Sequence, residues 1–490
     1  MNFKADWSFL EKISMGAVSS REVIRQLNAC GHKVIELERY STSNKIWTTK
    51  IKRLRLPDLI CLNCGRRIES RAKSKLDVRM SDNDNNPNRS WDVGLADKDI
   101  IAFIQCSKDD SGWQPASSVN YFETKSLRET VDLSNLGKPK SAGEGAEKDR
   151  VWSTCIPRKD GEISEIIKLK DKVQIKVKYD DGSRPYTYSF KNEKKYNIYV
   201  NKGDHFDANA TMIAGVPTKK TSMNMCSATY DFLKDLKSEL KENRYAGVKA
   251  LGYLGKTEER INELKKLLII EEDHRIKLEI YSSLIRLGED LWEDFKNYAL
   301  TITDPIYRFE YVLILGELGE FDNATEKLCE IALNERLDSE LRSAAAWGIN
   351  VTARSISKLI EISSVSDDSV AAHAITNIIN NINNSWIDVL LECIHNDETG
   401  CIALKVLTTA NSISAKSVEQ AYKKNTGDDL KKKWCALTIG LMGPKEFDKK
   451  EIEKTAPEFY DTITNLWQYS VSAVNDYRSG QIDFLIKQSF

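Results

Sequence analysis

The 490-residue sequence has no excess of charge of one sign and no long apolar run. Its 72 Lys and Arg residues nearly balance 73 Asp and Glu residues, so the net charge is −1 and any nucleic-acid surface must be local. No apolar stretch approaches the roughly 20 residues that a membrane helix needs, and the N-terminus lacks a signal-peptide pattern. These absences predict a protein without a membrane partner.

The sequence also lacks the cysteine spacing of a disulfide framework, although it contains ten cysteines. Scattered cysteines favour a reducing compartment, and we therefore expect a cytoplasmic protein. Four of them fall in the C-terminal half, where we expect small buried core residues. They are Cys329, Cys393, Cys401 and Cys435.

The length and the changes of pattern predict a multidomain α+β protein. Residues 1–130 read as an α/β domain. Residues 131–149, rich in Gly, Ser, Lys and Pro, read as a linker. Residues 150–225 alternate in short strands with turns and predict a small β module, and residues 226–490 predict amphipathic helices.

Within the β module, residues 200–216 (VNKGDHFDANATMIAGV) contain a strand that ends in Gly-Asp, a short loop and another strand. This segment resembles one half of a barrel-sandwich hybrid fold, which implies a small β-barrel or sandwich. Nucleic-acid contact, partner docking and simple spacing all remain open as its role.

In the helical part, small-apolar stripes end at Gly255, Gly288 and Gly319, which lie 33 and 31 positions apart. The pattern resembles HEAT-type repeats with C-capping glycines, which implies an α-solenoid. An ordinary helical bundle is the alternative. Solenoids bind on their concave faces, so we expect a protein partner, self-association into a homo-oligomer, or nucleic acid there.

The stretch from Leu56 to Lys75 predicts two strands joined by a tight Cys-Leu-Asn-Cys-Gly turn. If Cys61 lies opposite Arg66, Asp58 lies opposite Glu69. Opposed Cβ atoms are roughly 5 Å apart, and two carboxylates at that distance suit a divalent metal. Because side chains alternate along a strand, Glu69, Arg71 and Lys73 share one face.

Pro57-Asp58 followed by Glu69 resembles the motif of the PD-(D/E)xK nucleases. A predicted helix at 19–30 and strands at 32–39 and 99–106 supply the flanking order of that restriction-endonuclease-like fold. Arg71 stands where the family has lysine, and Lys73 lies one step further. The resemblance implies Mg²⁺ or Mn²⁺ on Asp58 and Glu69, and hydrolysis of DNA rather than RNA.

In that family the lysine positions a water or stabilises the oxyanion, a role that falls here to Lys73 or Arg71. Glu22 on the predicted helix is the candidate third metal ligand, with Glu36 and Glu38 as rivals. A second acid-x-Lys, Glu123-Thr-Lys125, is an alternative site. By analogy of fold, a nuclease joined to a solenoid suits restriction or anti-phage defence. The competing hypothesis is a non-catalytic scaffold that binds nucleic acid or protein.

Basic residues surround this hairpin, and Asp58 is the only acidic residue between Ser41 and Arg67. Such a local positive field favours a phosphate backbone. We expect nucleic-acid contacts from Lys50, Lys52, Arg53, Arg55, Arg66 and Arg67.

The turn Cys61-x₂-Cys64-Gly65 has the pattern of half a zinc knuckle. In an antiparallel meander the start of the first strand lies near the end of the second. Cys30 and His32 would then complete a Cys₃His set for Zn²⁺. The alternative is that Cys30 lies on the buried face of the helix and the Cys-x₂-Cys turn carries free thiols.

Overall fold

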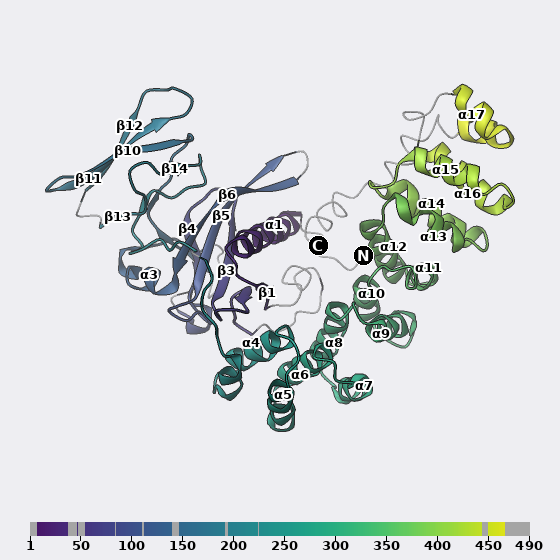
Figure 1. Ribbon diagram of the computed structural model, residues 1–490, viewed down its shortest axis with the longest axis horizontal. Helices are drawn as coiled ribbons and strands as arrows, with labels where there is room; N and C mark the ends of the chain where they lie inside the picture. The colour runs from purple at the N-terminus through teal and green to yellow at the C-terminus, as the bar shows by residue number, and fades with distance from the viewer. Residues whose placement is uncertain are drawn as a thin grey trace. The chain divides into compact units, whose positions relative to one another are not determined.

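The computed structural model describes residues 7–37, 47, 54–83, 85–109, 112–139, 147–191, 195–223, 225–442 and 449–465 (Figure 1). The chain divides into two compact units. The first unit covers the described residues from 8 to 290 except Trp47. The second covers Trp7, Trp47 and the described residues from 291 onward. Strands predominate up to Gly215 and helices follow, as expected for a multidomain α+β protein.

A five-stranded mixed sheet forms the centre of the first unit, in the order β1-β2-β3-β5-β6. Neighbouring strands are antiparallel except β3 and β5, which run parallel. Helix α1 (Trp7–Ala29) packs on one face, where Val23 and Leu27 share a core with Leu59 and Ile68. The strands are β1 (Val34–Glu36), β2 (Leu59–Cys61), β3 (Arg67–Lys73), β5 (Ile100–Asp109) and β6 (Gly112–Glu123).

The β2–β3 hairpin has the predicted register. Leu59 pairs with Ile68, Ile60 pairs with Arg67, and the Cys61 N–H donates to the Arg66 carbonyl over 2.9 Å. Continued by one residue beyond β2, this register places Asp58 opposite Glu69. Turn chemistry explains the agreement, because Gly65 adopts the left-handed φ of +67° that closes the five-residue turn.

The predicted linker at 131–149 is wrong in part, because strands form at both of its ends. Strands β7 (Asn135–Leu136) and β8 (Lys148–Trp152) join β4 (Val78–Asp82) in a three-stranded sheet of order β4-β8-β7. Apolar burial explains this pairing. Trp152 is fully buried, and its ring meets that of Trp91 at a centroid distance of 5.0 Å.

The β module forms two small antiparallel sheets, in the orders β12-β11-β10-β14 and β13-β15-β9. Ile163, Ile175 and Val177 centre its core. Met212 and Val216 instead belong to the core that contains Trp152, so the module is not packed independently of the preceding domain. Its strands are β9 (Thr154–Cys155), β10 (Gly161–Lys168), β11 (Lys172–Tyr179), β12 (Tyr186–Lys191), β13 (Asn197–Ile198), β14 (His205–Phe206) and β15 (Ala214–Gly215).

The first unit ends with helices that begin after the 3₁₀ helix η4 (Phe232–Lys237). Within this unit α6 packs against both α4 and α5. Gly255 and Gly288 adopt left-handed φ values of +81° and +86°, as expected for C-capping positions. The helices are α4 (Lys241–Gly252), α5 (Glu258–Ile270) and α6 (His274–Arg286).

The second unit is a run of helices with the packing order of a solenoid. Helices α8, α10, α12, α14 and α16 contact one another in succession, as do α9, α11, α13 and α15. Gly319 lacks the left-handed φ predicted for it. The helices are α7 (Trp292–Thr301), α8 (Pro305–Glu317), α9 (Asp322–Leu333), α10 (Ser339–Gly348), α11 (Ile356–Ser363), α12 (Asp368–Asn381), α13 (Ile387–Glu392), α14 (Asp397–Thr409), α15 (Ala415–Lys424), α16 (Asp429–Met442) and α17 (Lys449–Thr455).

The prediction for the cysteines of the helical part is confirmed for three of the four. Cys329, Cys393 and Cys435 are buried as expected, whereas Cys401 is exposed and is not among the buried residues of α14. Within the described ranges, no helix combines the length and apolar character required to cross a membrane.

Candidate metal centre and the acidic hairpin

The acidic hairpin comprises β2 and β3 with Asp58 and Glu69 opposite each other. The Ser70 N–H donates to Asp58 Oδ2 over 2.8 Å. Glu69 Oε1 pairs with Arg71 Nη2 at 2.8 Å, and the two side chains are 12% and 42% exposed. Ser70 also bonds through its hydroxyl to Ser19 of α1, at 3.0 Å. Each of the two acids thus has a partner from its own hairpin.

Lys73 is held at the far end of β3. Its ammonium donates to the Arg79 carbonyl over 2.7 Å and lies 3.4 Å from Asp77. The ammonium also lies 5.9 Å from the centre of the Phe103 ring. Burial lowers the pKa of Lys73, and the nearby Asp77 carboxylate opposes that shift. A catalytic role for Lys73 therefore requires it to leave these partners.

The predicted third ligand does not join the acidic pair. Glu22 accepts from Arg25 and from the side-chain amide of Gln26, both at 2.7 Å. In the part of the chain that the structure describes, its carboxylate forms no three-ligand group with Asp58 and Glu69. Glu22 is separate from the acidic pair because its carboxylate is engaged by Arg25, three residues further along α1.

Among the described residues, the alternative acidic candidates belong to no group of three or more metal-ligating side chains. Glu36 lies in β1 at intermediate burial, where its charge acts on Arg21, and Glu38 lies outside the described residues. Glu123 is the N-cap of the short helix α3 (Thr124–Arg128). Lys125 lies 3.8 Å from Glu129, so the Glu123-Thr-Lys125 motif is a helix start with an i,i+4 ion pair.

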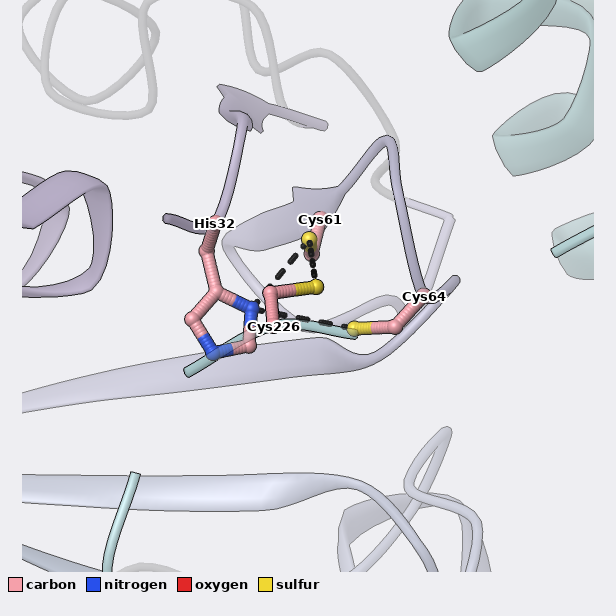
Figure 2. A group of neighbouring side chains, drawn as sticks. All are labelled: His32, Cys61, Cys64 and Cys226. Carbon is pink, nitrogen blue, oxygen red and sulfur yellow. Dashed lines mark hydrogen bonds between the residues drawn. The ribbon is translucent and has the colours of Figure 1, made fainter. Parts of the chain in front are cut away.

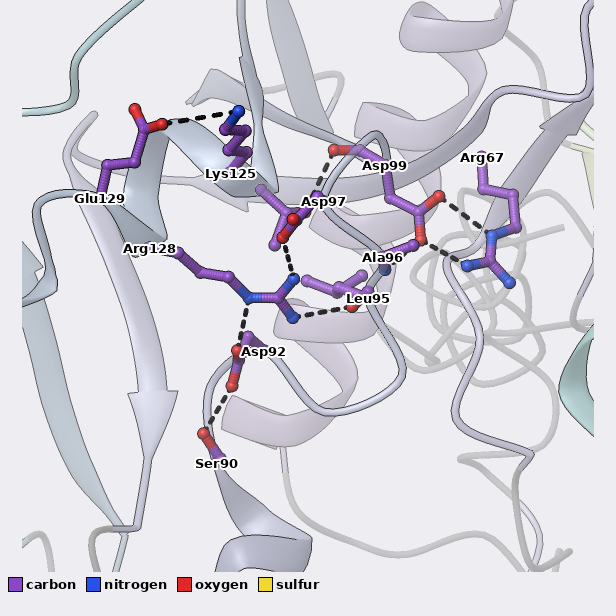
Figure 3. Close-up of polar contacts among 11 residues, drawn as sticks. Arg67, Ser90, Asp92, Leu95, Ala96, Asp97, Asp99, Lys125, Arg128 and Glu129 are labelled. Carbon is purple, nitrogen blue, oxygen red and sulfur yellow. Dashed lines mark hydrogen bonds and ion pairs between the residues drawn. The ribbon is translucent and has the colours of Figure 1, made fainter. Parts of the chain in front are cut away.

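The predicted nucleic-acid contacts require one correction, at Arg67. This side chain is buried and donates to Asp99 through Nε at 3.0 Å and Nη2 at 2.7 Å (Figure 3). A guanidinium committed to a buried carboxylate cannot serve a phosphate. Arg55 is exposed and Arg66 is half-buried, so both remain candidates. Lys50, Lys52 and Arg53 lie outside the described residues.

Four side chains converge at the closed end of the hairpin and form the His–Cys cluster, which consists of His32, Cys61, Cys64 and Cys226 (Figure 2). His32 Nδ1 lies 3.3 Å from Cys61 Sγ and 3.7 Å from Cys64 Sγ. Cys226 Sγ lies 3.9 Å from Cys61 Sγ. The ligand atoms of all four residues lie within 4.8 Å of one another, so the cluster can hold a metal ion such as zinc.

The sequence predicts Cys30 as the fourth ligand, and Cys226 takes that place instead. The Cys226 N–H donates to the Cys30 carbonyl over 3.0 Å. Cys30 therefore positions the fourth residue of the cluster through its backbone, while its own thiol lies outside the cluster. The Cys61-x₂-Cys64 motif supplies two of the four ligands of a structural zinc site, so the sequence indicates that two more are required. No local pattern marks Cys226, which lies 165 positions beyond Cys61.

Backbone hydrogen bonds hold the segments that carry the cluster. His32 follows α1, and its N–H donates to the Leu27 carbonyl over 3.0 Å. The Tyr230 N–H donates to the Asn63 carbonyl over 2.7 Å, which fastens the segment of Cys226 to the hairpin turn. The Asn63 side chain in turn donates to the Gly31 carbonyl over 3.1 Å. These bonds join the three segments without using a ligand side chain.

Contact between the two hairpin thiols shifts their pKa values in opposite directions. The contact with Cys64 lowers the pKa of Cys61 to about 4; burial opposes the shift, and the Cys64 N–H, His32 and the Asn63 N–H assist it. The same contact, together with burial, raises the pKa of Cys64. Cys61 is therefore the thiolate of the pair, and thiolate is the form that ligates metals.

Comparison of the sequence with protein-family models and with curated proteins found no match. The chemistry of this protein is therefore inferred from its own residues.

Proposed function

We propose that the first unit is a metal-dependent nuclease in which Asp58 and Glu69 hold Mg²⁺ or Mn²⁺, as the resemblance to PD-(D/E)xK enzymes implies. The observation that carries this proposal is the β2–β3 register, which places the two acids opposite each other. The parallel pairing of β3 with β5 and the packing of α1 on the same sheet support it. DNA is the proposed substrate.

The acidic pair fits a hard cation that keeps part of its hydration shell. Mg²⁺ typically binds one or two carboxylates together with waters and substrate phosphates, so a third protein ligand is not required. Asp58 uses one oxygen for the Ser70 N–H and has a second for the cation. The Glu69–Arg71 pair is partly exposed, and such pairs contribute about 0–1 kcal/mol. A divalent cation can therefore replace Arg71 at Glu69.

The acidic and basic side chains of the hairpin would have different roles in the reaction. A metal ion on Asp58 and Glu69 would supply an activated water and neutralise charge on the phosphate. Arg71, once released from Glu69, donates to the phosphate oxygens, which guanidinium binds in bidentate fashion. Lys73 adds a second positive charge on the same face of β3. Arg55 and Arg66 attract the nucleic-acid backbone.

A non-catalytic scaffold is the second candidate, and one observation favours it. Arg71 occupies Glu69, while Lys73 is engaged by Asp77 and the Arg79 carbonyl. A nuclease fold with these pairs locked would bind without cutting. The helical solenoid, which we propose to be of HEAT type, would then hold a protein partner or a second copy of the chain.

Incubation of the protein with plasmid DNA or RNA and Mg²⁺ or Mn²⁺ separates the two candidates. Asp58→Asn and Glu69→Gln preserve shape and remove charge, and the amide oxygen that Asp58→Asn introduces can still accept from the Ser70 N–H. Glu162→Gln, at an exposed position of β10, is the matched control. We expect cleavage by the wild type and by the control, with a loss of about 100-fold or more in the other two variants.

Equal cleavage by all variants would refute the proposed site. Binding of DNA by the wild type without any cleavage in either metal would favour the scaffold. Preferential cleavage of RNA would keep the site and change the substrate.

A further inference from the structure

We propose that the His–Cys cluster is a structural Zn²⁺ site with a Cys₃His ligand set. Through Cys226, this site links the segment that leads into the helices to the turn of the acidic hairpin. This inference does not rest on nuclease activity. It concerns four side chains and the three chain segments that carry them.

Three distances within the cluster lie close to the edges of a zinc tetrahedron. Zn–S and Zn–N bonds of about 2.3 and 2.0 Å place two sulfur ligands about 3.8 Å apart, and a sulfur and a nitrogen ligand about 3.5 Å apart. The Cys61–Cys226 sulfur separation is 3.9 Å. The Nδ1 atom of His32 lies 3.3 Å from Cys61 Sγ and 3.7 Å from Cys64 Sγ.

The donor set selects zinc over the other plausible outcomes. A disulfide requires sulfur atoms about 2.05 Å apart, and all three cysteines are free. Mg²⁺ and Ca²⁺ prefer oxygen ligands, whereas three thiolates and an imidazole suit zinc. Four protein ligands fill a tetrahedral shell, which is the arrangement of a structural centre rather than a catalytic one.

The shell around the thiols also suits a bound cation. Backbone N–H groups of Asn63 and Cys64 donate to Cys61, and the Arg66 N–H donates to Cys64. Such donors stabilise thiolate ligands and fix their direction. The backbone bonds from Cys226 to Cys30 and from Tyr230 to Asn63 hold the ligand segments together. These backbone bonds bring the ligand segments together, and a bound metal adds a restraint at the side chains themselves.

The position of the site indicates its role. Cys61 and Cys64 bracket the turn of the acidic hairpin, and His32 precedes its neighbour β1. Cys226 lies in the segment that leads to η4 and α4. A zinc ion on these ligands restrains the hairpin turn and ties the start of the helical segment to it, within the first unit.

Metal analysis of the full-length protein tests the site, with Cys226→Ser compared with Cys30→Ser. These two cysteines are joined by a backbone hydrogen bond, but only Cys226 has its thiol in the cluster. We expect one zinc per chain in the wild type and in Cys30→Ser. In Cys226→Ser, competition with a chromogenic chelator should show affinity weaker on the order of 100-fold, since one of four ligands is lost.

Cobalt substitution provides a readout that does not depend on the stability of the Cys226→Ser variant. Co²⁺ in the wild type should give tetrahedral d–d bands with thiolate charge-transfer absorption, and His32→Cys should retain the metal with stronger charge transfer. Equal zinc affinity in Cys226→Ser and the wild type would overturn the proposal. So would zinc loss in Cys30→Ser alone, iron in place of zinc, or failure of the zinc-supplemented wild type to bind the metal.

Discussion

Removal of the Asp99 carboxylate is expected to loosen the parallel pair β3–β5, which carries Glu69 and Lys73. Asp99 precedes β5, and its side chain is fully buried. It accepts two hydrogen bonds from Arg67 of β3 and a third, of 2.7 Å, from the Ala96 N–H (Figure 3). Asp99→Ala leaves all three donors without this acceptor.

The expected loss is about 3–5 kcal/mol, the range for breaking a buried ion pair by removal of one partner. The uncompensated charge of Arg67 dominates this loss, because its side chain is only 11% exposed. Arg67 keeps a hydrogen bond from Nη1 to Asn243 Oδ1 at 3.2 Å, and it interacts electrostatically with Asp235. These interactions moderate the loss without restoring the buried pair.

The same loop provides a matched control. Asp97 pairs with Arg128, but its side chain is 64% exposed. Exposed pairs contribute about 0–1 kcal/mol, and Arg128 retains Asp92 at 2.8 Å. Asp97→Ala should therefore change stability by less than about 1 kcal/mol.

Native-state hydrogen exchange measures the effect where it is expected, at the amides of residues 68–73 and 101–105. A local probe is needed because a chain of two units need not unfold in one step. The opening free energy of these amides should fall by several kcal/mol in Asp99→Ala and little in Asp97→Ala. Equal effects in the two variants would refute the reasoning about burial.

Three further predictions concern other parts of the molecule. Burial lowers the pKa of His373 to about 4. The unfolded state therefore binds an extra proton as pH falls from 6.5 to 4, and the second unit should lose about 3 kcal/mol of stability over that range. Denaturant titrations of wild type and His373→Asn should show this pH dependence in the wild type alone. At Gly65 an alanine Cβ would lie 2.5 Å from the Tyr230 ring, whereas at Gly182, which also has positive φ, it would meet nothing within 4 Å. Thermal melts should show a loss of stability of about 1 kcal/mol in Gly182→Ala and a clearly larger loss in Gly65→Ala. Chelation of zinc should increase proteolysis between residues 225 and 231, and mass spectrometry showing unchanged cleavage there would contradict the structural role.

Local chemistry explains what the sequence predicted correctly. The β2–β3 register follows from a five-residue turn that ends in Gly65, so Asp58 and Glu69 could be placed opposite each other without a structure. The antiparallel pairing of β1 with β2 joins Val34 to Cys61. This pairing is why His32 was recognised as a neighbour of the thiols.

Contacts between distant segments explain what the sequence missed. Arg67 belongs to a run of cations, and nothing near it in the sequence shows that Asp99 will bury it. The sequence predicts Cys30 as the fourth ligand because it lies close to His32, whereas Cys226, 165 positions beyond Cys61, gives no local signal. Gly319 matched the spacing of the other capping glycines, but α8 ends without a left-handed residue there.

The position of Cys226 has a consequence for the order of synthesis. A ribosome exposes the imidazole and the first two thiols long before it adds the fourth side chain, so the nascent polypeptide carries an incomplete binding pocket through the production of β3 to β15. A truncated product that stops at residue 225 would keep the hairpin and the strands that the structure describes, but it would lack the fourth side chain of the His–Cys cluster. Expression of the sheet region alone would therefore yield a protein that lacks Cys226 and so has an incomplete His–Cys cluster.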